Sequence, residues 1–103
     1  MAEFTGAKYI TRGIENEIPI ELQTIMWNMI DQDKQQGKGM DYLQIFTLKS
    51  AFENGVIMQE VTHTQEQPPR KKKITIKSET PVSAKIFVID DVTHTTMLLN
   101  HEY

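Results

Sequence analysis

The sequence predicts an α+β fold in which one amphipathic helix packs on a mostly antiparallel sheet of about five strands, in two layers. Two observations lead to this class. Apolar residues recur with the helical period in one stretch, and segments rich in β-branched and aromatic residues, separated by turn signals, fill most of the remaining chain. A helix with a single apolar stripe must bury that stripe, and one face of a sheet provides the surface.

The helix is expected to run from about Pro19 to about Gln36. Proline suits the first helical turn because its missing N–H is one of the unpaired donors there, and three glutamates between residues 15 and 21 complement the helix dipole. Gly37 and Gly39 provide the flexible positions at which helices commonly end. The apolar stripe has six members at helical spacing: Ile18, Leu22, Ile25, Met26, Met29 and Ile30.

Five segments have the composition of strands. They are residues 8–11, 41–50, 56–66, 73–77 and 84–90. Asn54-Gly55 favours a tight hairpin between the second and third, and Pro68-Pro69 ends the third. The alternating lysines of residues 73–77 predict an edge strand, whereas the apolar run in residues 84–90 predicts an interior one. The segment Asp91–Tyr103 is compatible with a short strand or with one helical turn.

Length and composition limit the possible functions. The chain has 103 residues and we expect one domain, residues 1–103. It has no cysteine, which excludes disulfides, thiolate zinc sites, iron–sulfur clusters and a cysteine nucleophile. The N-terminal region does not resemble a signal peptide and no apolar run is long enough for a membrane helix. We therefore expect a soluble cytoplasmic protein that makes no membrane contact.

The charge is unevenly distributed along the chain. The formal charge is −3, yet residues 66–85 carry six cations and two anions. Within them, the stretch Arg70, Lys71, Lys72 and Lys73 is a candidate binding site for nucleic-acid phosphates. No aromatic residue for base stacking lies between residues 66 and 85. The simpler interpretation is a solvated loop that leads into an edge strand, where lysines deter aggregation.

A second apolar strip lies on the predicted helix. Ile20 and Trp27 are seven residues apart, on a side of the helix well away from the main stripe. Tryptophan is enriched in binding hot spots, so this strip is a candidate surface for a protein partner or for a second copy of the chain. Alternatively, the N-terminal segment or the C-terminal tail folds over the helix and covers the strip.

The histidines and nearby carboxylates suggest only weak candidate sites. Asp90, Asp91 and His94 have metal-binding side chains but lack a recognised ligand spacing, and a turn in which the aspartates cap backbone N–H groups is the simpler interpretation. His63, on a predicted strand, is expected to be half exposed. There is no phosphate-binding glycine motif and no recognisable nucleophile setting, so we expect no enzyme, no metal and no cofactor.

The chain resembles a family of small bacterial proteins, the group designated domain of unknown function 960. The resemblance covers nearly the whole chain and is carried by residues 9–14, 17–23, Trp27, 41–46, 87–91, 96–99 and Glu102-Tyr103. Members occur in staphylococci and related Firmicutes, some of them on phages or other mobile elements. The resemblance implies a cytoplasmic bacterial protein and supplies no activity, cofactor or catalytic residue.

These observations leave three functional hypotheses. The leading one is a small non-enzymatic interaction module or homodimer that uses Ile20 and Trp27. The alternative is a nucleic-acid-binding protein that uses Arg70, Lys71, Lys72 and Lys73. The third is metal-assisted chemistry at Asp90, Asp91 and His94.

Overall fold

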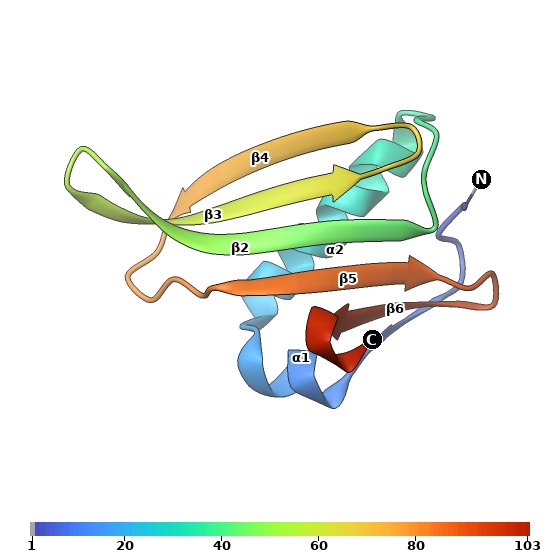
Figure 1. Cartoon of the computed structure of the whole chain (residues 1–103), viewed down its shortest axis with the longest axis horizontal. Helices are drawn as coiled ribbons and strands as arrows, with labels where there is room; N and C mark the ends of the chain where they lie inside the picture. The colour runs from blue at the N-terminus through green and yellow to red at the C-terminus, as the bar shows by residue number, and fades with distance from the viewer. Residues whose placement is uncertain (1) are drawn as a thin grey trace.

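A six-stranded sheet with one long helix on one face forms the molecule (Figure 1). The computed structural model describes residues 2–103. The strand order in the sheet is β1-β6-β5-β2-β3-β4. The elements in chain order are β1 (Ala7–Ile10), α1 (Arg12–Glu17), α2 (Ile20–Gln35), β2 (Leu43–Glu53), β3 (Val56–Gln65), β4 (Arg70–Lys77), β5 (Ala84–Asp90), β6 (His94–Leu99) and the 3-10 turn η1 (Asn100–Glu102).

Helix α2 confirms the expected long helix to within a residue at each end. Pro19 is its N-cap, and the backbone leaves the helix through Gln36 to Gly37, which has a φ of 68°. Five members of the predicted stripe are buried, and Ile25 packs partly buried against them. The stripe therefore provides the helix side of the core.

The short helix α1 was not predicted. Thr11, expected to end the first strand, instead caps this helix, because its hydroxyl oxygen accepts a hydrogen bond from the N–H of Ile14 at 3.3 Å. Two of the glutamates expected at the start of the long helix, Glu15 and Glu17, belong to α1. Ile14 is completely buried and anchors α1 to the core.

The predicted β2–β3 hairpin is present, and its first strand continues to Glu53, beyond the expected end at Ser50. Asn54 and Gly55 have φ values of 52° and 78°, the left-handed pair that a two-residue hairpin turn requires. β2 pairs with β5 only as far as Leu48, but it pairs with β3 as far as Glu53. The hairpin consequently extends beyond its neighbours as an arm, visible at the left of Figure 1.

The remaining strands give a sheet of six strands instead of five. β5 is an interior strand and β4 an edge strand, as predicted, but β4 begins at Arg70 and so includes the basic stretch, for which a loop is the simpler interpretation of the sequence. The C-terminal segment Asp91–Tyr103, expected to be either a strand or a helical turn, contains both: strand β6 and then the turn η1. β1 pairs in parallel with β6 and forms the other edge.

The two faces of the sheet differ. Most residues of the central strands that face α2 are buried, among them Phe46, Leu48, Val61, Ile86 and Val88. No helix comparable to α2 covers the opposite face within residues 2–103; in Figure 1 this face points to the viewer, and only η1 lies over one end of it. We call it the open face. None of the helices in the described part of the chain is long and apolar enough to cross a membrane.

Candidate nucleic-acid interface and the polar cluster behind it

Strand β4 divides the basic stretch between the two faces of the sheet. Because side chains alternate along a strand, Lys71 and Lys73 project from the open face, whereas Arg70 and Lys72 project toward α2. Lys72 Nζ donates to the Gln32 side chain on α2 at 3.2 Å. The four cations predicted as one patch are therefore two pairs with different surroundings.

Cross-strand pairing places the open-face lysines in rows with residues of other strands. In one row, Lys85 is opposite Thr47, Thr47 is opposite Thr62, and Thr62 is opposite Lys73. The row runs from β5 through β2 and β3 to β4, and three strand spacings of about 4.8 Å separate its ends by about 14 Å. Two threonine hydroxyls thus lie between two ammonium groups on an exposed surface.

The next row contains the aromatic group that the basic stretch itself lacks. Phe87 of β5 is opposite Ile45, Ile45 is opposite Thr64, and Thr64 is opposite Lys71. The ring of Tyr103 stands nearly perpendicular to that of Phe87, with centroids 5.6 Å apart.

The backbone that carries Tyr103 is anchored to the rest of the chain by Glu102. One carboxylate oxygen of Glu102 accepts from the Thr11 hydroxyl at 2.7 Å and from the N–H of Leu99 at 2.8 Å, and the other accepts from the N–H of Gly13 at 3.3 Å. The hydrogen bond from Thr11, followed by those from the backbone, lowers the pKa of Glu102. A charged Glu102 therefore fastens η1 to α1.

The open face is positively charged although the protein is acidic. Five lysines project from the described strands on this side: Lys49, Lys71, Lys73, Lys77 and Lys85. Two glutamates accompany them. Glu60 lies 3.8 Å from the Nζ of Lys73, and Glu53 is at the tip of the hairpin arm. An array of cations on an uncovered surface is suited to binding a polyanion.

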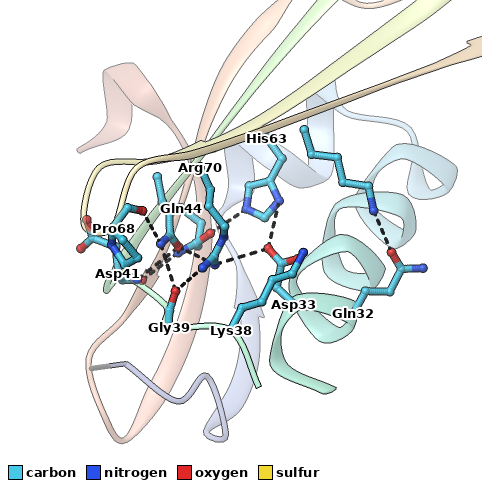
Figure 2. Close-up of polar contacts among 11 residues, drawn as sticks. Gln32, Asp33, Lys38, Gly39, Asp41, Gln44, His63, Pro68 and Arg70 are labelled. Carbon is cyan, nitrogen blue, oxygen red and sulfur yellow. Dashed lines mark hydrogen bonds and ion pairs between the residues drawn. The ribbon is translucent and has the colours of Figure 1, made fainter. Parts of the chain in front are cut away.

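Behind the sheet, Arg70 belongs to a network of polar side chains between β2, β3, β4 and the end of α2 (Figure 2). Its guanidinium group donates to the carbonyl oxygen of Gly39 and, at 3.0 Å, to the side-chain oxygen of Gln65. The amide nitrogen of Gln65 donates to the carbonyl oxygens of Gly39 and Pro68 at 3.0 and 2.8 Å. Arg70 is thus part of the internal structure and not of the open face.

The network also fixes the proton on His63. The amide nitrogen of Gln44 donates to the Asp41 carbonyl and to the Gln65 side chain, both at 2.8 Å, so its oxygen must be the atom that lies 2.6 Å from Nε2 of His63. Nε2 therefore donates, and Nδ1 of the neutral ring carries the lone pair.

His63 is buried, which corrects the expectation of a half-exposed strand histidine. It is only 4% exposed because it lies opposite Phe46 on the α2 side of the sheet. Burial is the main reason that its pKa falls from 6.5 to about 4; the Asp33 carboxylate opposes the shift, and the charges of Arg70 and Lys72 add to it.

Asp33, on the last turn of α2, is the carboxylate of this cluster. It lies 3.6 Å from both the Arg70 guanidinium group and Lys38 Nζ, and 4.0 Å from Nδ1 of His63. A pocket of about 80 Å³ opens beside Asp33 and His63. Neither residue spacing nor hydrophobic periodicity in the sequence identifies this polar cluster, because its side chains come from four separate elements.

The two residues of the predicted helix strip have different environments. Ile20 is 65% exposed and lines a shallow hollow that also includes Ile10 and Pro19. Trp27 is partly buried against the core, with Lys8 Nζ 5.4 Å from the centroid of its ring. The N-terminal region thus covers part of the tryptophan and leaves the isoleucine accessible.

The carboxylates before β6 form a turn, as the simpler interpretation predicted. Asp90 accepts hydrogen bonds from the N–H groups of Glu3, Phe4 and Val92. Asp91 accepts from the N–H of His94 at 2.9 Å, and this bond is the main reason that the pKa of Asp91 is lowered. Among residues 2–103, no three histidine, aspartate or glutamate side chains gather as a metal site would require.

Sequence reasoning counted Lys85 with the basic segment 66–85 but missed Lys49 and Phe87 as companions of Lys71 and Lys73. The available signal was the period of two in each strand, which assigns every second residue to one face. To find which residues of different strands lie side by side on that face, the pairing register is also needed, and long-range contacts determine it.

Comparisons with known proteins agree on the fold and leave the activity open. A crystal structure of a protein of unknown function from Enterococcus faecalis superposes with a TM-score of 0.72 at 24% identity, covering 100% of this chain and 97% of that one. No curated protein matches the chain. A family model described as "Staphylococcal protein of unknown function (DUF960)" matches residues 7–102, and the chain belongs to this family.

Proposed function

We propose that this protein acts by binding and not by catalysis, and that its ligand is a nucleic acid held on the open face of the sheet. The observation that carries the proposal is the charge of that face. Five lysines and two glutamates project from it, although the whole chain has a formal charge of −3. Lysines that neutralise phosphates release counterions, and this release drives sequence-independent binding.

The arrangement of the lysines supports a nucleic acid better than a small anion. They are spread over β2, β4 and β5, and the row from Lys85 to Lys73 spans about 14 Å. The threonines between them can donate hydrogen bonds to phosphate oxygens. A linear polyanion can contact all of these groups at once.

Fluorescence anisotropy with labelled oligonucleotides over a salt series tests the proposal. The double variant Lys71→Gln/Lys73→Gln removes two open-face cations. Lys38→Gln/Lys72→Gln removes two exposed cations from the α2 side and changes the net charge equally. We expect only the open-face variant to weaken binding, with the slope of log K against log salt reduced by about 0.7–0.9 per lysine. Absence of binding at low salt, or equal losses in both variants, would contradict it.

A second candidate function, self-association through the Ile20 and Trp27 strip, rests on the exposure of Ile20. An isoleucine that is 65% exposed on a helix is an apolar group for a second copy to cover. The partial cover that Lys8 gives Trp27 reduces what the tryptophan can contribute. This proposal therefore has less support than the first.

Light scattering after size exclusion, over a range of concentrations, tests self-association. We expect a dimer that dissociates in Ile20→Glu and in Trp27→Ala, whereas Asn28→Glu, an exposed change on the same helix, leaves it intact. A wild-type monomer at every concentration would eliminate this candidate.

A further inference from the structure

We propose that the nucleic acid bound by the open face is single stranded, and that one of its bases stacks on Tyr103. This inference rests on the proposed function. It depends on a different observation, namely that an exposed aromatic ring lies on the same face as the lysines. In a duplex the faces of the bases are stacked inside the helix, so an aromatic side chain can use them only where the strand is unpaired.

Tyr103 is positioned to receive a base. Its side chain is 73% exposed, and its ring stands at 87° to Phe87 with centroids 5.6 Å apart. Phe87 thus supports the tyrosine from the sheet, while the tyrosine keeps most of its surface open to solvent. Phe87 is itself only partly buried, and Lys85 Nζ lies 6.0 Å from the centroid of its ring.

The backbone that carries the tyrosine is also anchored, which reduces the entropy lost when a ligand stacks on the ring. The N–H of Tyr103 donates to the Asn100 carbonyl at 3.3 Å, and Glu102 ties the preceding turn to Thr11 and Gly13. A preorganised aromatic side chain with two torsions loses little freedom on binding.

The cations lie at distances that suit a strand whose base is on Tyr103. Lys85 lies next to Phe87, and Lys71 is at the far end of the same cross-strand row, three strand spacings or about 14 Å away. A single strand that places a base on the tyrosine can run across β5, β2 and β3 and bring its next phosphates to the lysines of β4.

The test compares a thymidine oligonucleotide with an abasic phosphodiester strand of equal length and with a duplex, using anisotropy at fixed salt. We expect wild type to bind the thymidine strand about tenfold more tightly than the abasic one. Tyr103→Ala should lose this preference, while its affinity for the abasic strand and its salt dependence stay unchanged. Tyr103→Phe should retain the preference, because the ring remains.

The control is Tyr42→Ala, which removes another exposed tyrosine, one that lines a hollow with Ala2, Met40 and Val92. It should behave as wild type. Equal binding of thymidine and abasic strands by wild type, a retained preference in Tyr103→Ala, or tighter binding of the duplex overturns the single-strand inference and leaves the nucleic-acid proposal standing. No binding of any of the three ligands refutes both. Ribose and deoxyribose strands, compared in the same assay, show which of the two sugars the protein prefers.

Discussion

His63 stacks on Phe46 directly across the β2–β3 pairing, with ring centroids 4.3 Å apart and ring planes inclined by 13°. The stack seals one side of the imidazole with an apolar ring, and Gln44 holds Nε2 through a hydrogen bond. Both contacts suit the neutral ring. Protonation puts a charge against the core, and for this reason burial dominates the shift in the pKa of His63.

Folding should consequently weaken in mild acid. The pKa of His63 is about 4 in the folded protein and 6.5 when it is unperturbed. Between these values the unfolded chain binds more protons, so the free energy of unfolding falls as the pH drops from about 6.5 to about 4 and levels off below that. The contribution of this histidine is about 3 kcal/mol at most.

Urea denaturation at intervals between pH 7.5 and 4.5 measures this effect. His63→Gln should flatten the dependence in that window, at a cost in stability at pH 7. His101→Gln, which changes an exposed histidine, should leave it unchanged. A wild-type free energy of unfolding that is constant over the window, or an NMR titration that gives His63 a pKa near 6.5, would show that the imidazole is not held neutral.

Asp33→Asn should lower both stability and the pKa of His63. The Asp33 carboxylate raises that pKa, and it lies 3.6 Å from Arg70 and from Lys38. Because both cations reach solvent in part, we expect a loss of about 1 kcal/mol, less than for a fully buried pair. Asp31→Asn is the matched control, since Asp31 is on the same helix and pairs with Lys8. A raised or unchanged pKa of His63 in Asp33→Asn would contradict this account.

Gly6→Ala tests the parallel pairing of β1. A Cβ at residue 6 would lie 2.7 Å from the carbonyl oxygen of Thr93, just before β6, and 2.8 Å from the Cα of His94, the first residue of β6. The strands must separate to admit it, at a cost of about 1–3 kcal/mol. Thr5→Ala, an exposed change next to it, should be nearly neutral. Thermal unfolding compares both variants with wild type. A melting temperature of Gly6→Ala equal to that of wild type would mean that β1 is not held against β6.

Local sequence patterns predict correctly those helices and turns whose packing in the folded protein agrees with the pattern. The apolar stripe of α2 and the Asn54-Gly55 turn follow from spacing and from φ requirements alone. Helix α1 was missed because its first turn looks like the end of a strand, and because part of its stabilisation comes from Glu102, about ninety residues away. Tertiary contacts of this kind override local propensity.

The candidate site depends even more strongly on tertiary contacts that the local sequence does not show. The positive charge of residues 66–85 was evident in the sequence, but its division by β4 and its combination with Lys49, Lys85 and Phe87 depend on strand register. His63 was misjudged because alternation along a strand does not by itself say which face is covered. The α2 side of β3 could be recognised only once the helix was placed on it.

The projecting arm of the β2–β3 hairpin should be the most labile part of the long strands. Lys49–Glu53 have no partner on β5, since that pairing ends at Leu48 opposite Ala84, and Phe52 at the tip is 74% exposed. Few buried contacts oppose local opening there. Hydrogen exchange should give the amides of 51–57 protection lower by about tenfold or more than those of 45–48. Equal protection would mean that something covers the arm. Repeating the measurement at lower protein concentration then distinguishes a second copy from a contact within the chain, because only contact with a second copy weakens on dilution.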